Sequence, residues 1–204
     1  PSPITFLAAA AAVTDNIRLI PTVFVLPTYH PLRLAEEICM LDQISRGRVE
    51  FGVGRGIVPH ELALFGIHPL EAPDIMKETF DVLMSALTQE SVSHRGHYYK
   101  FFNVPMEIRP FQTPHPPLWN TSASADAMRA AGREGSNIMV MKHPDDCKVM
   151  LRAYMSGWRE THKGNHPLPK LALTRHIFVS RSQRAAEERG QFGFNGWYRS
   201  HSAM

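Results

Sequence analysis

Cysteine is scarce in this sequence, long apolar runs are missing, and basic residues do not cluster. The 204 residues include two cysteines, Cys39 and Cys147. Both fall on apolar faces of predicted helices, so we expect buried thiols in a reducing compartment and no disulfide framework. No stretch approaches the roughly 20 apolar residues of a membrane span. Lysine and arginine exceed aspartate and glutamate by only 22 − 19 = 3 and are scattered. We therefore expect a cytoplasmic protein with no membrane or nucleic-acid partner.

Common phosphate-binding and zinc-binding motifs are also absent. The stretch "EFGVGRG" (residues 50–56) begins like the dinucleotide fingerprint GxGxxG, but Ile57 stands where the third glycine is needed. No GxxxxGK followed by Ser or Thr occurs anywhere. His94 and His97 flank Gly96 in a predicted hairpin, and neither an HExxH helix nor a cysteine pair supports a metal there. We therefore expect no metal site, and the glycines need another explanation.

What the sequence does contain is a regular alternation of apolar strands and amphipathic helices. We predict strands at residues 17–27, 48–54, 117–123, 136–141 and 171–180, with an irregular start to the first because of Pro21. Helices are predicted at residues 31–45, 74–87, 124–135, 144–158 and 182–200, the first ended by Gly47. Helical spacing predicts that the first buries Leu34, Ile38, Leu41 and Ile44, and the fourth Cys147, Leu151, Tyr154 and Trp158.

This alternation predicts an α/β fold of parallel strands, either a doubly wound sheet or a (β/α) barrel. Residues 91–117 interrupt the rhythm with five prolines and are expected to form a β-hairpin and loop insertion. We expect residues 1–204 to form a single domain. A complete eight-unit barrel takes about 250 residues, so five units would be an incomplete barrel, and we expect the chain to be a fragment.

Two segments combine the residue types that bind phosphate at predicted strand ends. One is Arg55 among its neighbouring glycines, where a guanidinium can grip a phosphate with two hydrogen bonds. The other is "TSAS", residues 121–124, where free amides at a helix N-terminus favour an anion. The alternatives are that the glycines merely fit a crowded strand end, that Arg55 pairs with Glu61, and that Ser124 is a simple N-cap.

At this point the residues resemble a known family. "IRLIPTVFVLPTYHPLRLAEEICMLDQISRGRVEFGVGRG" and "ELALFG", then "RGHYYKF", "PPLWNTSASADAMRAAGREG" and "HIFVSRSQRAAEERG", are similar to the bacterial luciferase-like, flavin-dependent monooxygenases. The resemblance covers nearly the whole chain and implies a (β/α)8 TIM barrel, here without its early strands and last unit. It implies that reduced FMN, supplied by a separate flavin reductase, and O2 oxidise a small organic, aldehyde-like substrate.

The resemblance also implies a cofactor site, residue by residue. Arg55 should hold the FMN phosphate, together with Ser122 and the amides around Thr121 and Ala123. Gly54 stands where luciferases carry a cysteine close to the flavin ring, which argues against light emission. The resemblance further implies that Thr22 and Val23 form a non-proline cis peptide beside the ring. It also implies that Glu36, on the helix at residues 31–45, lies in a dimer interface.

Several assignments stay open at this stage. The family's active-site histidine lies on a strand that this chain lacks, so the catalytic residues are unknown. His30 is explained by N-capping or solvation, and Trp119 either packs in the barrel or stacks on the flavin, with packing favoured. Two alternatives to a monooxygenase remain: a non-catalytic flavin-binding relative or subunit, and an unrelated α/β nucleotide-binding module.

Overall fold

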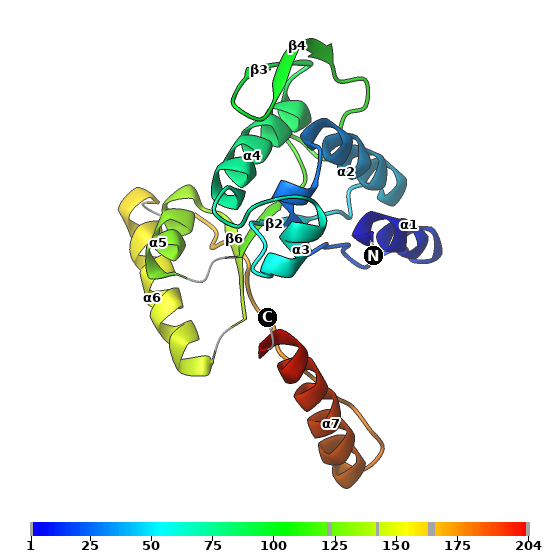
Figure 1. Cartoon of the computed structure of the whole chain (residues 1–204), viewed down its shortest axis with the longest axis vertical. Coiled ribbons are helices and arrows are strands. Elements are labelled where there is room, and N and C mark those ends of the chain that lie inside the picture. The colour runs from blue at the N-terminus through cyan, green and yellow to red at the C-terminus, as the bar shows by residue number, and fades with distance from the viewer. Residues whose placement is uncertain (1, 122–123, 142, 163–165, 203–204) are drawn as a thin grey trace.

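Five parallel strands form one sheet, and each is followed by at least one helix (Figure 1). A computed structural model describes residues 2–121, 124–141, 143–162 and 166–202. The sheet has the order β1-β2-β5-β6-β7. Its strands are β1 (Phe24–Val25), β2 (Phe51–Gly54), β5 (Leu118–Thr121), β6 (Asn137–Val140) and β7 (Leu171–Leu173). The helices are α1 (Pro3–Val13), α2 (Pro31–Ser45), α3 (Pro59–Leu64), α4 (Ala72–Thr88), α5 (Ala125–Glu134), α6 (Pro144–Thr161) and α7 (Gln183–Ser202), with a 3₁₀ turn, η1, at Leu26–Thr28.

The strand order follows the chain order without a reversal. A doubly wound sheet requires such a reversal, whereas successive units of a (β/α) barrel add their strands in sequence. All neighbouring strands of the sheet are parallel. The barrel-type arrangement predicted from the family is therefore confirmed. Within the described residues the sheet is open, with β1 and β7 at its edges.

The first and last strands are much shorter than predicted. Of residues 17–27 only β1 is a strand, preceded by an isolated bridge between Leu19 and Val49. Pro21 has no N–H to donate to a ladder, and η1 begins directly after Val25. At the other edge, β7 pairs only with β6, and the backbone contacts between them end where the Thr174 N–H donates to the Val140 carbonyl. Beyond that point β6 offers no partner strand, so residues 175–180 remain irregular.

The helices pack as their apolar spacing predicts, with two exceptions. In α2, Leu34, Ile38 and Leu41 are buried but Ile44 is exposed. Six residues after Ile38 is about 120° around the helix, away from the buried stripe, so the prediction for Ile44 was wrong. In α6, Cys147, Tyr154 and Trp158 are buried, but Met150 takes the inward place predicted for Leu151, which is 42% exposed. Arg46 and Gly47, both at positive φ, end α2.

Helices α5 and α6 cross at a very short distance. A Cβ atom on Gly132 of α5 would lie 2.1 Å from the Tyr154 carbonyl oxygen, and one on Gly157 of α6 would lie 1.9 Å from the Arg129 carbonyl oxygen. Glycine at both positions lets the two backbones touch. The crossing fixes the direction of α5, whose N-terminus follows the C-terminal end of β5.

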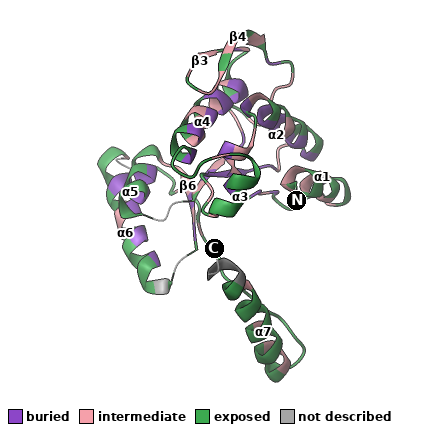
Figure 2. Cartoon of the chain, in the orientation of Figure 1, coloured by how far each residue is buried: buried purple, intermediate pink, exposed green. Residues whose placement is uncertain are grey.

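A β-hairpin and helix α7 lie outside the packed helices and the sheet. Strands β3 (Ser91–Arg95) and β4 (Lys100–Pro105) form an antiparallel hairpin at the end of α4, at the top of Figure 1. Helix α7 projects away from the other helices (Figure 1), and its residues are mostly exposed, in contrast to the buried faces of α2 and α4 (Figure 2). None of the helices in the described part of the chain combines the length and apolarity that crossing a membrane requires.

Candidate functional site

Three chain segments meet around the C-terminal end of β2: the residues just before β1, the end of β2 itself and the end of β5. The peptide bond between Thr22 and Val23, just before β1, is cis, as the family resemblance implied. A Cβ atom on Gly54, the last residue of β2, would lie 2.8 Å from Val23 Cγ2 and 3.5 Å from Thr121 Oγ1, at the end of β5. The Thr121 hydroxyl donates to the Val53 carbonyl at 3.4 Å. Thr22, Val23, Gly54 and Thr121 are thus brought together at the end of the sheet where parallel α/β folds place their ligands.

The glycines of β2 are explained by packing against the cis peptide. A Cβ atom on Gly52 would come within 3.3 Å of the Pro21 carbonyl oxygen and of side-chain carbons of Thr22 and Val23. Gly56 has φ +83°, where other residues are strained, and its Cβ would lie 2.8 Å from Val25 Cγ1. These contacts agree with the view that the glycines fit a crowded strand end, and the role of Gly54 beside a cofactor stays a prediction.

Arg55 is the charged group of this region. Its side chain is exposed, and within the described residues it forms no ion pair, with Glu61 or with any other carboxylate. The alternative pairing with Glu61 is therefore wrong. A guanidinium held at a strand end without a counter-charge remains available to an anion, which a bidentate contact suits.

The second predicted phosphate-binding segment is only partly described. Ser124 is the N-cap of α5, and its hydroxyl accepts the Ala127 N–H at 3.3 Å. Ser122 and Ala123 lie outside the described residues. The N-cap of α5 follows Thr121 by three residues, so the dipole and amides of this helix lie at the same end of the sheet as Arg55. An exposed guanidinium and a helix N-terminus are the groups that fit a phosphorylated cofactor such as FMN.

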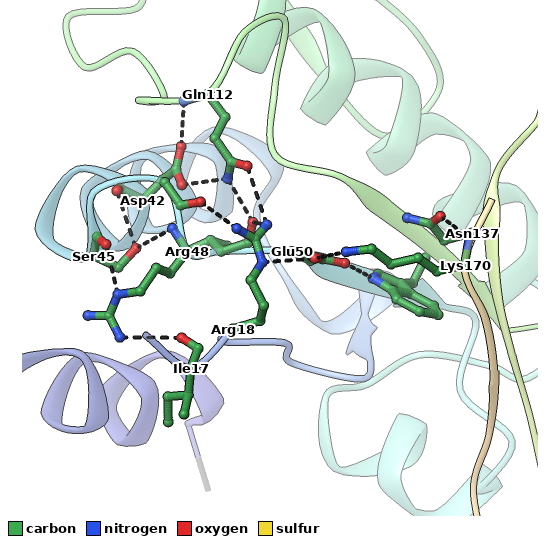
Figure 3. A network of polar contacts seen from close by, with 12 residues as sticks. Ile17, Arg18, Asp42, Ser45, Arg48, Glu50, Gln112, Asn137 and Lys170 are labelled. Atoms are coloured by element: carbon green, nitrogen blue, oxygen red, sulfur yellow. Dashed lines mark hydrogen bonds and ion pairs between the residues drawn. The ribbon is translucent and has the colours of Figure 1, made fainter. Parts of the chain in front are cut away.

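The opposite, N-terminal end of the sheet holds a buried polar network (Figure 3). The Glu50 side chain is fully buried and accepts hydrogen bonds from Arg18 Nε at 2.9 Å and from the indole N–H of Trp119 at 2.6 Å. The Lys170 ammonium forms an ion pair with the same carboxylate. Burial alone would raise the pKa of Glu50, but the hydrogen bonds from Lys170 and Trp119 and the charges of Lys170 and Arg18 outweigh it, so this pKa is lowered.

Gln112 and Asp42 extend this network to neighbouring loops, because Arg18 also donates to Gln112 Oε1 at 3.4 Å. Gln112 donates its backbone N–H to Asp42 Oδ2 at 2.9 Å and its side-chain amide to Asp42 Oδ1 at 2.8 Å, and that amide also reaches the Val49 carbonyl at 2.7 Å. Arg18 donates to the Gly47 carbonyl at 2.8 Å. We call the residues Arg18, Glu50, Trp119 and Lys170 the floor of the sheet. All their buried polar groups are hydrogen-bonded, since no buried side-chain N or O atom in the described residues lacks a partner.

Sequence reasoning missed this floor. Trp119 was expected to pack in the barrel or stack on flavin, and it packs, with its indole bonded to Glu50. The available signal was the charged Glu50 directly before an apolar strand, since a carboxylate there must be paired when buried. The partners of Glu50 lie 32, 69 and 120 residues away in the sequence, and no sequence pattern identifies them.

His30 and Glu36, the other candidates on or next to α2, contact neighbouring side chains. His30 is the N-cap residue of α2 but makes no capping hydrogen bond, and its ring lies edge-on to Tyr99 and Phe101 with centroids 5.8 Å apart. Glu36 is half-exposed beside Arg33, 4.0 Å away, and its role in a dimer stays a prediction.

The HxxH pair lies against Glu78 of α4. That carboxylate accepts the backbone N–H groups of His97 and Tyr98, at 3.0 Å and 3.1 Å, and of Tyr99 at 2.7 Å, and it contacts His94 Nε2 at 3.2 Å. Desolvation opposes ionisation of Glu78, but these hydrogen bonds prevail and its pKa is lowered. Within the described residues no group of three His, Cys, Asp or Glu side chains is placed to hold a metal ion.

Comparison with known proteins gives a consistent result. The family model described as luciferase-like monooxygenase matches residues 1–201. The uncharacterized protein y4wF of Sinorhizobium fredii is 36% identical over 97% of this chain and 58% of its own length. The oxygenase component of a flavin-dependent trigonelline monooxygenase from Acinetobacter baylyi is 28% identical over 98% of this chain and 58% of its own length. The chain thus spans little more than half of these relatives.

A solved structure extends the likeness to the fold. The monooxygenase RslO1 from Streptomyces bottropensis superimposes with a TM-score of 0.87 at 28% sequence identity. It is matched over 100% of this chain and 63% of the RslO1 chain. The open sheet and helices described above are therefore matched by 63% of a longer chain of the same fold.

Proposed function

The chain belongs to the luciferase-like monooxygenase family, and from that premise we propose that it is the FMN-binding part of a two-component monooxygenase. In this proposal a separate flavin reductase supplies reduced FMN, and the protein oxidises a small organic, aldehyde-like substrate with O2. Support for the flavin and the separate reductase comes from the A. baylyi relative, which is named as the oxygenase component of a flavin-dependent enzyme.

One observation carries the proposal. The cis peptide at Thr22–Val23, the end of β2 and the end of β5 converge, and exposed Arg55 follows directly. We assign the phosphate of FMN to Arg55 and to the N-terminal end of α5, including Ser122 and the amides near Thr121 and Ala123. The flat ring would then lie toward Thr22, Val23 and Gly54.

The cofactor would supply the redox chemistry, because reduced FMN delivers the two electrons and two protons that convert O2 and an aldehyde to a carboxylic acid and water. The residues of this chain would bind the phosphate, orient the ring and exclude water from it. We also propose a cytoplasmic location and a dimer formed through α2 around Glu36. The alternative function, a flavin-binding subunit without catalysis, uses the same site.

Oxygen labelling separates the two functions. The protein, a flavin reductase, NADH and FMN are mixed with a straight-chain aldehyde under ¹⁸O2, and the acid product is analysed by mass spectrometry. A monooxygenase places one ¹⁸O atom in the acid, and Arg55→Met lowers the yield whereas Arg152→Met, an exposed arginine on α6, does not. Binding of reduced FMN without labelled acid contradicts aldehyde oxidation and supports the non-catalytic alternative.

A further inference from the structure

The last strand of the sheet is weakly held by its own backbone. Strand β7 has three residues and pairs with β6 alone, through Ile138 with Leu171, Met139 with Ala172 and Val140 with Leu173. Leu171 and Leu173 are 43% and 62% exposed, so little apolar burial fixes the strand. Helix α7, which follows, projects away from the other helices (Figure 1). A short edge strand with so little burial has a poorly specified position.

Lys170, directly before β7, supplies the contacts that the strand lacks. Its backbone N–H donates to Asn137 Oδ1, at the start of β6, at 2.9 Å. Its ammonium reaches Glu50, directly before β2 (Figure 3). The order β2-β5-β6-β7 puts three strand spacings between these two residues, about 14 Å measured along a sheet. Extended side chains barely reach over that span, so a direct ion pair on one face is favoured when the sheet curls around it.

The inner face of β2 shows which way the sheet curls. Side chains alternate along a strand, so Glu50 shares a face with Gly52 and Gly54. Those glycines face Thr22, Val23 and Thr121 at the candidate cofactor site. Trp119, on β5, donates to Glu50 from the same face. The ion pair therefore lies inside the curve, below the candidate site.

Burial of Glu50 makes the Lys170–Glu50 contact favour one position of β7 over others. Replacing a buried ion pair with apolar side chains often costs nothing, so the pair adds little net stability. A buried carboxylate that loses one of its two cations is disfavoured, however, even with Arg18 and Trp119 still bonded to it. Arrangements that separate Lys170 from Glu50 are therefore penalised. The Lys170 side chain is 59% exposed and Glu50 is fully buried, so the penalty falls on Glu50.

We propose that Glu50 and Lys170 act as positioning residues that hold β7 in the curve of the sheet. The pair turns the C-terminal end of β7 toward the ends of β2 and β5 and the Thr22–Val23 peptide, where the candidate site lies. The sequence separation of 120 residues makes it a link between the first and last parts of the described sheet. The proposal concerns the sheet itself and holds whichever cofactor binds.

The direct test is a distance measurement between β7 and α2 by pulsed electron spin resonance. Spin labels are attached through ketone-bearing unnatural residues at positions 33 and 173, which leaves Cys39 and Cys147 unchanged. A second pair at positions 33 and 126 serves as control, because α5 is placed by β5 and not by Lys170. Each pair is measured in the wild-type chain, in Lys170→Met, in Lys170→Arg and in Lys148→Met, which removes a surface lysine paired with Asp145.

The choice of Lys170→Met avoids unfolding, because Glu50 keeps Arg18 and Trp119. We expect the 33–173 distance to lengthen and its distribution to broaden in Lys170→Met only, while the 33–126 distance stays unchanged and Lys170→Arg behaves like wild type. An unchanged 33–173 distribution in Lys170→Met overturns the proposal. So does an equal change in both label pairs, which indicates general loosening, or a failure of Lys170→Arg to restore the distance.

Discussion

Gly157→Ala is expected to destabilise the chain strongly, although alanine normally favours a helix. In an unconstrained helix the change stabilises by up to about 1 kcal/mol. Here the new Cβ would lie 1.9 Å from the Arg129 carbonyl oxygen, against at least 3.4 Å for ordinary contact, so α5 and α6 must separate by 3.4 − 1.9 = 1.5 Å. The obstructing atom is backbone, so no side chain can rotate away.

Separation of the helices would weaken two hydrogen bonds donated by α6, one to the residue after the C-cap of α5 and one to α5 itself. The Tyr154 hydroxyl donates to the Ser136 carbonyl at 2.7 Å, and the Thr161 hydroxyl donates to the Arg133 carbonyl at 2.8 Å. Overpacking of this kind costs about 1 to 3 kcal/mol, and for a chain of this size each kcal/mol corresponds to about 2 to 4 °C in Tm. We expect Tm to fall by about 2 to 12 °C.

Thermal unfolding followed by circular dichroism measures this effect, with Gly193→Ala as the matched control. Gly193 also lies inside a helix, α7, but a Cβ there would meet no atom within 4 Å. We expect Gly193→Ala to leave Tm unchanged or to raise it. A Gly157→Ala chain that is as stable as wild type, or that gains as much as Gly193→Ala, would refute the close crossing of α5 and α6.

Three further predictions concern titratable groups. The folded-state pKa of Glu50 is lowered below 4.5, so its stabilisation is complete above about pH 4.5 and is lost as pH falls through the folded pKa; urea unfolding from pH 6 to pH 3 should show this loss, less steeply in Lys170→Met, and equal slopes would contradict it. Glu78→Gln should speed amide hydrogen exchange in the hairpin turn by at least about tenfold, whereas Asp81→Asn on the same helix should not. Protection that survives in Glu78→Gln would show that the Glu78 carboxylate does not hold the turn. Burial raises the pKa of the Cys39 thiol to about 11, so iodoacetamide at pH 8 should alkylate Cys39 only after unfolding. Labelling of Cys39 in the native chain would show that α2 separates from the core it packs against.

The position of the candidate site, at the C-terminal end of the sheet, could be predicted because the rules that bring its residues together are local. Arg55 follows an apolar strand and Thr121 ends another, and parallel strands bring such ends to one edge. Pro31 and Gly47 likewise marked the two ends of α2. The family resemblance added the cis peptide at Thr22–Val23, which no propensity rule suggests.

The buried polar network at the N-terminal end of the sheet could not be predicted, because its partners are brought together only by the folded order of the strands. Arg18, Glu50, Trp119 and Lys170 stand in four separate segments, and each by itself has an ordinary surface or core explanation. Ile44 illustrates a different limit. Helical spacing permits more than one apolar stripe, and only the packed neighbours decide which stripe is buried.

The central claim is that Arg55 grips the phosphate of FMN at the C-terminal ends of the strands. It is tested most directly by titrating photoreduced FMN and reduced riboflavin into the wild-type chain, Arg55→Met and Arg152→Met, with binding followed by flavin absorbance. We predict that Arg55→Met weakens FMN binding at least tenfold, about 1.4 kcal/mol, and leaves riboflavin binding unchanged, while Arg152→Met changes neither. Equal affinity of the wild-type and Arg55→Met chains for FMN, or an equal loss for FMN and riboflavin, would contradict the claim.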